Sequence, residues 1–304
     1  MIYECMESRS YVEPRRLCIL GRPGVGKTEL CKTVAMPNIN GRSVCMNDDG
    51  VVYVKTPASA FQKGIPTRIL FALGDPFYGK GARDIQTIRI ESVIEKRQFK
   101  LLIIDEFHHF IDRNNKEVLY EISDWLKNLS DNIRAGIILL GLPEAIEVLQ
   151  VNEQLARRFS CVKTVEPFCW DSQEKMDEFC QFLKFFEGNL PFSAPSNLGD
   201  PTNMALRFFF ATEGVADYVK KLISRGTKNA LEAGHANLSL SALEAAYQSE
   251  MSFIFSDKQN PFQLDIDVSR LTADYTRLIA KRNERTARAC KENPSAKFFG
   301  RGTK

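Results

Sequence analysis

The chain has 304 residues, of which 44% are hydrophobic, 10% aromatic and 26% charged. These values are typical of a globular protein with enough apolar material for a core, so they exclude a largely disordered or fibrous chain. Lysine and arginine number 41 and aspartate and glutamate 38, which gives a net charge of only +3. Residues 251–304 hold 11 of the basic and 6 of the acidic residues, so this end is positive while the rest is slightly negative. The asymmetry predicts a basic interaction tail.

The first 16 residues contain no apolar stretch of signal-peptide length, and no segment approaches the roughly 20 apolar residues of a membrane helix. The eight cysteines form no CxxC pair, which argues against a zinc site and against a disulfide framework. We therefore expect a reduced, cytoplasmic protein with no membrane contact. The segment before the first predicted strand is short, so we expect it to lack a partner-binding extension.

Four short apolar runs predict buried strands in the first part of the chain, at residues 17–20, 51–55, 101–104 and 137–140. Residues 162–165 are the candidate for a fifth strand. Helical patterns separate them, as in residues 118–129, where apolar residues recur at helical spacing. Continuous apolar strands that alternate with helices predict an α/β fold with a five-stranded parallel sheet flanked by helices.

After residue 167 the patterns are helical, and no strand is evident. We therefore expect a smaller, all-helical domain after the sheet, followed by a basic segment that forms a helix or a tail. The predicted organisation is a short N-terminal segment at 1–16, an α/β core at 17–168, a helical domain at 169–253 and the basic C-terminal segment at 254–304.

A phosphate-binding loop is predicted at residues 21–28, which read GRPGVGKT and match G-x-x-x-x-G-K-[ST] between a strand and a helix. Lys27 is expected to reach the β- and γ-phosphates, and Thr28 to ligate Mg²⁺. A chance glycine-rich turn is the alternative, and the order of strand, loop and helix disfavours it. The predicted nucleotide contacts in this segment are Gly21, Arg22, Pro23, Gly24, Val25, Gly26, Lys27, Thr28 and Glu29.

Two carboxylates follow the third predicted strand, in the sequence LLIIDE at 101–106. A buried strand places Asp105 at the carboxyl edge of the sheet, where it would hold Mg²⁺ through water, and Glu106 where a base would polarise the attacking water. The alternative for two adjacent acids is a solvated turn. No guanine-specifying N-K-x-D motif occurs, which favours ATP. His108 and His109 come next, and we expect a polar loop role for them rather than metal binding.

Arg157 and Arg158 form a basic pair in NEQLARRF, at residues 152–159. Such a pair is either a solvated helix surface or, in an oligomeric ATPase, the source of an arginine finger for the neighbouring subunit. Spacing alone does not decide between the two.

These elements resemble the AAA+ transposition regulators of the TnsC/TniB type over about residues 15–250. The resemblance rests on GRPGVGKT, LLIIDEFHHF and IILLGLPEAIEVLQVNEQLARRF. It implies an AAA+ P-loop core with a small helical lid domain, and an ATPase whose hydrolysis controls release or disassembly. It also implies assembly into a ring, such as a hexamer or heptamer, or a helical filament on double-stranded DNA. Such proteins link a TniQ-type target selector to a TnsB-type transposase, and some serve CRISPR-associated transposons. By resemblance, Arg158 is the better finger candidate and Arg157 the second.

The resemblance also implies two DNA-facing loops. The first, at residues 56–68, offers Lys63 and Arg68, and the second, at 79–83, offers Lys80 and Arg83. These cations would neutralise phosphates without reading sequence. For each residue taken singly, a solvated surface charge is the alternative.

Two departures from the family pattern predict slow turnover. Relatives often have a polar residue after the fourth strand, where this chain has Leu142, and many AAA+ proteins have an arginine in the lid helix, where Asp217 and its neighbours follow Gly214. Two other classes of protein are alternatives to this interpretation. One is an IstB/DnaC-like loader of a helicase or transposase. The other is a metabolic P-loop kinase, against which the helical domain and the basic tail argue.

Overall fold

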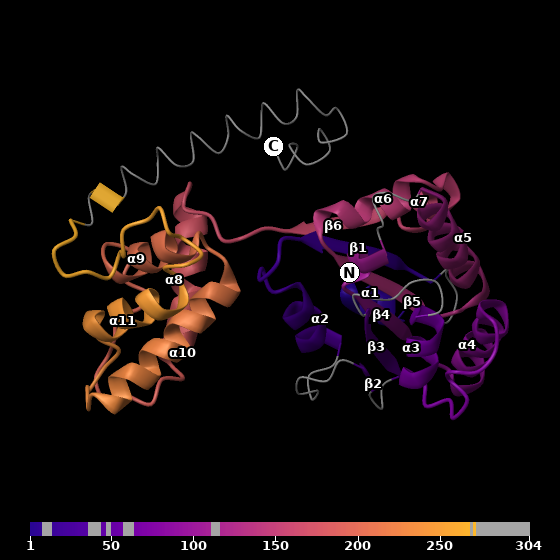
Figure 1. Ribbon diagram of the computed structural model, residues 1–304, viewed down its shortest axis with the longest axis horizontal. Helices are drawn as coiled ribbons and strands as arrows, with labels where there is room; N and C mark the ends of the chain where they lie inside the picture. The colour runs from indigo at the N-terminus through magenta and orange to yellow at the C-terminus, as the bar shows by residue number, and fades with distance from the viewer. Residues whose placement is uncertain are drawn as a thin grey trace, which may run out of the picture. The chain divides into compact units, whose positions relative to one another are not determined.

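The structure is a computed structural model that describes residues 1–7, 14–35, 44–46, 50–56, 64–110, 116–267 and 270–271. The chain divides into two compact units, Met1–Glu166 and Pro167–Lys304 (Figure 1). The first unit is built around a β-sheet, and the described part of the second consists of helices and the turns between them.

The sheet of the first unit has the strand order β2-β3-β4-β5-β1-β6. Five of these strands are parallel, which confirms the predicted sheet, and the short strand β2 pairs antiparallel with β3 at the edge. A run of three residues carries no recognisable periodicity, so β2 was not predicted. The strands are β1 (Arg16–Gly21), β2 (Val44–Met46), β3 (Val51–Lys55), β4 (Leu101–Asp105), β5 (Gly136–Gly141) and β6 (Cys161–Val165).

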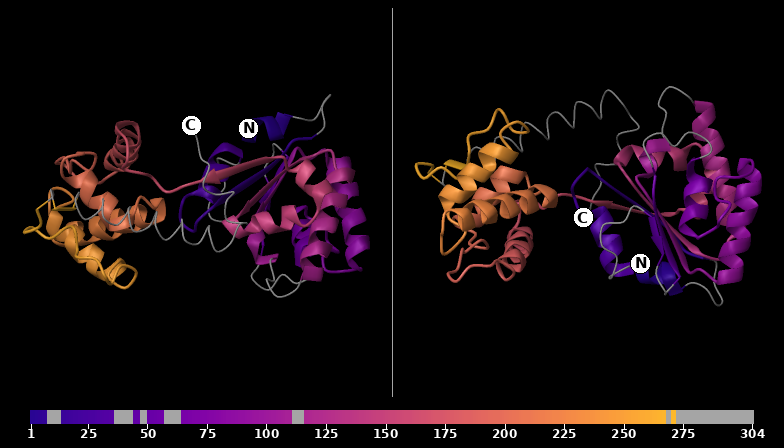
Figure 2. Two further views of the ribbon diagram at one scale, coloured as in Figure 1. Left: turned by 90° about the horizontal axis from the view of Figure 1, so that it is seen from above. Right: turned by 60° about the horizontal axis from the view of Figure 1, so that its bottom comes forward.

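Helices cover both faces of the sheet, because alternate residues of each buried strand point to opposite sides. Leu17 and Ile19 pack in the core on the α1 and α2 side, and Cys18 and Leu20 pack in the larger core under α3 to α7. Figure 2 shows these two layers from other directions. The helices are α1 (Ile2–Glu7), α2 (Lys27–Ala35), α3 (Gly64–Ala72), α4 (Arg83–Arg97), α5 (Lys116–Asn132), α6 (Ile146–Gln150) and α7 (Glu153–Arg158).

The N-terminal segment is part of the first unit's core. Cys5 on α1 is buried, and it joins the core on that side of the sheet. The backbone of α1 lies so close to β5 that a Cβ added at Gly136 would be 2.3 Å from the carbonyl oxygen of Cys5. The expected N-terminal segment at 1–16 therefore contains a helix that packs on the sheet.

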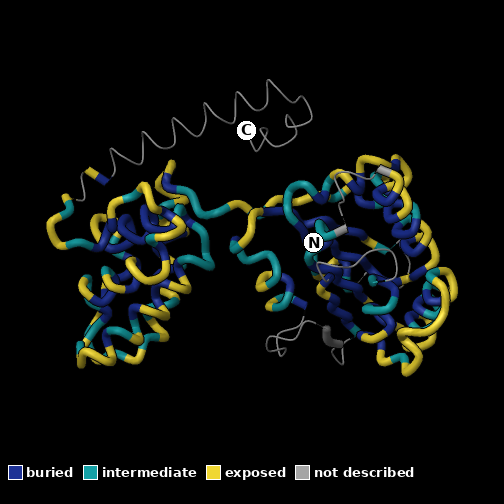
Figure 3. Tube along the Cα trace, viewed as in Figure 1, coloured by how far each residue is buried: buried dark blue, intermediate teal, exposed yellow. Residues whose placement is uncertain are grey.

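The second unit has its own aromatic core. Ser172 caps its first helix by accepting a hydrogen bond from the backbone N–H of Lys175, and every residue of the second helix is buried. Figure 3 shows buried residues concentrated inside each unit. The helices are α8 (Gln173–Glu187), α9 (Met204–Thr212), α10 (Ala216–Glu232) and α11 (Leu240–Glu250).

The packed part of this unit continues beyond residue 253, where we expected the tail to begin. Phe255 and Phe262 are buried in the helical core. The buried guanidinium of Arg207 donates hydrogen bonds to the carbonyl oxygens of Pro261 and Gln263. Residues up to about 266 therefore belong to the helical unit, because aromatic anchors and one buried arginine hold a segment that has no helical pattern of its own.

No helix in the described part of the chain has both the length and the apolar character needed to cross a membrane.

Candidate nucleotide site

The predicted phosphate loop lies between β1 and α2, and its glycines are required by its geometry. A Cβ at Gly21 would lie 2.4 Å from the carbonyl oxygen of Val165 on the adjacent strand β6, so no larger residue fits there. Gly24 and Gly26 have φ angles of 78° and 95°, a backbone conformation that side chains disfavour. The loop therefore places backbone N–H groups and the start of α2 around one point, as a phosphate-binding loop requires.

Lys27 bends back over this loop. Its Nζ donates to the carbonyl oxygens of Gly21 at 2.7 Å and Arg22 at 2.9 Å. Burial lowers the pKa of Lys27, and the nearby carboxylates of Glu106 and Asp105 oppose that shift. The ammonium group is thus held in the loop within the field of both acids, in a position to transfer its hydrogen bonds to a phosphate.

The structure brings the phosphate loop together with the acid pair. Asp105 ends β4 and is 2% exposed. Its Oδ2 accepts hydrogen bonds from Thr28 Oγ1 at 2.7 Å and from the Tyr53 hydroxyl at 2.6 Å, and its Oδ1 accepts one from the backbone N–H of Glu106 at 2.7 Å. A hydroxyl and a carboxylate side by side offer the oxygen ligands that Mg²⁺ prefers, so the residues fit that ion.

Tyr53 is a member of this site that the sequence analysis missed. It lies on β3, and its ring is almost fully buried. A buried tyrosine hydroxyl needs a hydrogen-bond partner. A tyrosine inside the apolar run VVYVK could therefore have indicated a polar group near this strand. Its partner depends on how β3 and β4 are aligned, which the sequence does not show.

Glu106 lies just beyond β4 with its backbone in the left-handed region, at φ 56°. This conformation is uncommon for a non-glycine residue. The two carboxylate oxygens have different partners. Oε1 lies 3.7 Å from Lys55 Nζ at the end of β3, and Oε2 lies 3.3 Å from His108 Nε2. Lys55 was also missed, because its contact comes from the register that sets it opposite Asp105.

His108 and His109 form a 3₁₀ turn with their neighbours, Phe107–Phe110. Their rings lie against each other, with centroids 4.3 Å apart and planes tilted by 40°. Glu106, His108 and His109 each offer one ligand atom, and these atoms lie within 4.8 Å of one another. Burial lowers the pKa of His108, while the Glu106 carboxylate opposes the shift.

The remaining predicted loop residues lie in the loop itself or in the first turn of α2. Val25 is buried, and the others are exposed. They are Arg22, Pro23, Val25 and Glu29.

Arg157 and Arg158 lie at the opposite edge of the sheet from the phosphate loop. They end α7, and the next strand, β6, starts at Cys161 beside the first residues of β1. The phosphate loop follows the other end of β1, about 16 Å away for a strand of this length. The structure therefore does not bring either arginine to the nucleotide site of its own chain.

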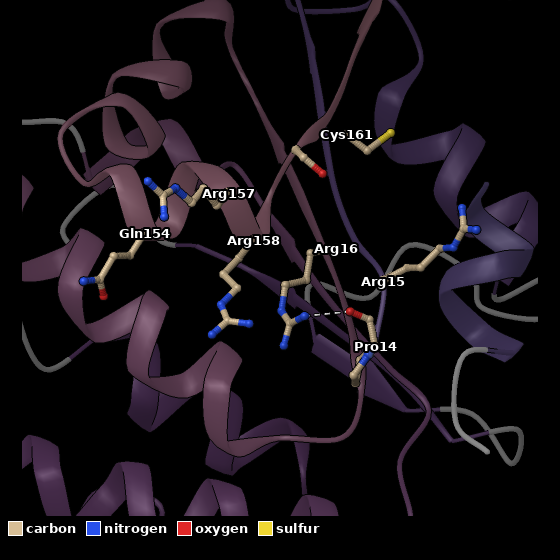
Figure 4. Close-up of a pocket in the computed structure, with 8 residues that line it drawn as sticks. Pro14, Arg15, Arg16, Gln154, Arg157, Arg158 and Cys161 are labelled. Atoms are coloured by element: carbon tan, nitrogen blue, oxygen red, sulfur yellow. Dashed lines mark hydrogen bonds between the residues drawn. The ribbon is translucent and has the colours of Figure 1, made fainter. Parts of the chain in front are cut away.

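A cavity of about 620 Å³ lies beside these arginines. Figure 4 shows Arg16, Arg157 and Arg158 near one another, with Arg15 extending to the other side. Arg158 Nη2 also pairs with Asp131 Oδ1 at 2.9 Å. The lining residues are Pro14, Arg15, Arg16, Gln154, Arg157, Arg158, Ser160 and Cys161.

The residues that were predicted to contact DNA are not all on loops. Arg68 lies within α3, because residues of GIPTRILFA are buried at helical spacing, and Arg83 is the first residue of α4. Arg83 Nη1 lies 3.4 Å from Glu121 Oε2. Lys80 is exposed in the connection between these helices, with its ammonium over the Phe77 ring. Lys63 lies outside the described residues.

The two residues that depart from the family pattern, Leu142 and Asp217, each contact a nearby side chain. The backbone N–H of Leu142, which follows β5, donates to His108 Nδ1 at 3.4 Å. Asp217, in the second unit, pairs with Lys221 on the same helix at 2.8 Å.

Comparisons with known proteins bear on the family and the fold. The model of a family described as bacterial TniB protein matches residues 2–167. None of the curated proteins matches the sequence.

Three solved structures are similar in fold. Cdc6p from Pyrobaculum aerophilum has a TM-score of 0.55 and 16% identity, and the match covers 78% of this chain and 60% of that one. The Aeropyrum pernix ORC1 protein in complex with DNA has a TM-score of 0.55 and 11% identity, with coverage of 84% and 65%. The ADP form of the Aeropyrum pernix ORC2 protein has a TM-score of 0.55 and 16% identity, with coverage of 81% and 65%. The chain spans about three fifths to two thirds of the length of these structures, and the likeness confirms the AAA+ fold.

Proposed function

The chain belongs to the TniB family, and from that premise we propose that it is an ATP-dependent regulator of transposition that assembles on double-stranded DNA. The observation that carries the nucleotide part of this proposal is the hydrogen bond between Thr28 and Asp105. It joins the phosphate-binding loop after β1 to the acidic end of β4, two strands away in the same sheet, at the carboxyl edge where ligands bind in α/β sheets.

Each residue of the site has a role in ATP hydrolysis under this proposal. The loop amides and Lys27 bind the phosphates, and Thr28 and Asp105 hold Mg²⁺, which when bound neutralises charge on the β- and γ-phosphates. Glu106 accepts a proton from the attacking water. Lys55 and His108 contact the Glu106 carboxylate, and in this proposal they hold it before it meets that water.

Assembly follows from where the arginines lie. Arg157 and Arg158 are at the far end of β1 from their own phosphate loop, which supports the proposal that they act on a second copy of the chain. Arg158, with Arg157 as the second candidate, supplies the arginine finger to the nucleotide of the adjacent subunit. ATP therefore stabilises contacts between subunits, in a ring or a helical filament.

DNA binding in this proposal is shared among subunits. Arg68, Lys80 and Arg83, together with Lys63, contact the phosphates of the duplex without reading base sequence. A few cations in each subunit give a large summed affinity in an assembly, which is compatible with a net charge of only +3. The assembly then connects a TniQ-type target selector to a TnsB-type transposase.

This proposal is tested by sedimentation of the full chain in four samples. They contain an ATP analogue alone, duplex DNA alone, both ligands, or neither. Large assemblies that require both ligands are expected. A monomer that is unchanged when both are present would overturn the proposal. Pull-down of a replicative helicase instead of a transposase would replace it with the loader function.

A further inference from the structure

We propose that His108 is the positioning residue of Glu106, and that it ties the Glu106 carboxylate to the backbone at the end of β5. The proposal rests on the proposed ATPase function, because it concerns the base of that reaction. It is carried by two contacts of one imidazole ring. His108 Nε2 lies 3.3 Å from Glu106 Oε2, and His108 Nδ1 lies 3.4 Å from the backbone nitrogen of Leu142.

The contact with Leu142 determines which ring nitrogen carries the proton. A backbone N–H can only donate, so Nδ1 must accept and is unprotonated. The single proton of a neutral ring is then on Nε2, where it donates to the Glu106 carboxylate. Burial favours the neutral ring by lowering the pKa of His108. The neutral His108 ring thus accepts a hydrogen bond from Leu142 and donates one to Glu106, so the ring does not need to be charged.

The backbone is shaped to allow this bridge. A Cβ at Gly141, the last residue of β5, would lie 2.8 Å from the Cβ of Ala145 and 3.5 Å from the backbone nitrogen of His108. Glycine is therefore required by the turn that follows β5, and the 3₁₀ turn after β4 lies in ordinary van der Waals contact with the same position. The turn carries the His108 ring to a point from which it reaches both Glu106 and Leu142.

The bridge gives Glu106 a fixed position between three adjacent strands. β3, β4 and β5 are neighbours in the sheet. Lys55, at the end of β3, approaches one carboxylate oxygen from one side, and His108 approaches the other oxygen while being held by the residue after β5. The side chain of Leu142 is apolar and cannot orient a base or a water. Its backbone N–H instead holds the His108 ring, and the ring in turn contacts and orients the Glu106 carboxylate.

The same tautomer argues against the alternative that Glu106, His108 and His109 hold a metal ion. A metal ligand at His108 Nε2 would require the ring proton on Nδ1. That proton would then face the backbone N–H of Leu142, and two donors would oppose each other. The hydrogen bond from Leu142 therefore favours the positioning role over metal binding.

A matched pair of substitutions separates the two contacts of the ring. In His108→Gln, the side-chain amide can still donate to Glu106 at the place of Nε2. In His108→Asn, the shorter amide can still meet the Leu142 N–H at the place of Nδ1, but it does not reach Glu106. We expect the steady-state kcat of His108→Asn to fall about 10- to 100-fold with little change in KM, as for the loss of a hydrogen bond to a charged group, and His108→Gln to recover most of the rate.

The controls distinguish this proposal from the ATPase function on which it rests. His109→Ala is expected to hydrolyse ATP like the wild type, and Glu106→Gln to bind ATP without hydrolysing it. If the wild type itself does not hydrolyse ATP with DNA present, the proposed function fails and this inference fails with it. If the wild type is active and His108→Asn is equally active, only the positioning role is wrong. Equal losses in the Gln and Asn variants would likewise overturn it.

A second measurement needs no activity. The chain has three histidines, so the ring nitrogens of His108 can be identified in ¹⁵N NMR spectra by comparison with His108→Gln. At neutral pH the neutral tautomer with the proton on Nε2 is expected. A ring protonated on Nδ1, or a fully protonated imidazolium, would contradict the bridge.

Discussion

The hydroxyl of Thr28 donates a 2.7 Å hydrogen bond to the carboxylate of Asp105, a residue 77 positions later in the chain. The contact exists because β1 and β4 end at the same edge of the parallel sheet, with only β5 between them. It brings two separate sequence motifs together into one site.

Lys27→Ala is expected to abolish ATP binding, with affinity lowered on the order of 100-fold or more, since it removes a charge-assisted contact with the phosphates. Lys32→Ala, on the same helix, is the control and should bind like the wild type. Titration with a fluorescent ATP analogue measures both. Tight binding by Lys27→Ala would show that the phosphates lie elsewhere.

Glu106→Gln is expected to keep ATP affinity while hydrolysis falls by about 10²- to 10⁴-fold, because the amide cannot accept the proton of the attacking water. The assembled state should then persist after ATP is added to DNA-bound protein. Phosphate release and sedimentation report the two effects. Hydrolysis at the wild-type rate would remove Glu106 from the role of base.

Arg158→Ala is expected to lower hydrolysis by roughly 10³-fold without changing ATP affinity, as in the loss of an arginine finger. Because the finger acts on a neighbour, mixing Arg158→Ala with Lys27→Ala should restore part of the activity. Each variant supplies what the other lacks. Asp131→Asn, which removes the ion pair of Arg158 but keeps the arginine, is the control for local damage. No recovery in the mixture would contradict action between subunits.

Tyr53→Phe is expected to lower the free energy of unfolding by about 1–2 kcal/mol, because the buried Asp105 carboxylate loses one of its three donors. Tyr120→Phe, at an exposed position on α5, should leave stability unchanged. Urea denaturation measures both. Equal stability of Tyr53→Phe and the wild type would show that the hydroxyl is not needed to satisfy Asp105.

Lys80→Ala and Arg83→Ala are each expected to weaken DNA binding about equally for all sequences, and to reduce the slope of log affinity against log salt by about 1. Lys96→Ala, in the last turn of α4, is the matched control. Fluorescence anisotropy with duplexes of different sequence provides the measurement. A strong preference for one sequence would contradict contacts confined to the DNA backbone.

The sequence predicted the elements with continuous apolar runs and missed those without. Four of the five parallel strands are buried runs, β6 is largely exposed, and each of the five was placed within a residue or two. Phe255 and Phe262 lie in a segment without periodicity, so their burial in the helical unit was not foreseen. A short segment can be held by a few anchors that no pattern reveals.

The site was predicted where a motif fixes it and missed where two strands must be aligned. Thr28 and Asp105 belong to motifs with known spacing. Tyr53 and Lys55 reach the acid pair through the pairing of β3 with β4, which is a property of the folded sheet. His108 was noticed, but its contacts with Glu106 and Leu142 come from a turn and a neighbouring strand end that only the structure brings together.

The separation of the phosphate loop from Arg158, at opposite ends of β1, gives each subunit a direction. Subunits that meet through those two ends join head to tail, and such contacts close into a ring or continue as an open helix. In a closed ring every nucleotide has its arginine. In an open helix, one end subunit keeps an incomplete site and the other presents an arginine without a nucleotide to meet. The two ends of a filament would then differ chemically, so growth and loss of subunits could proceed at different rates at each end.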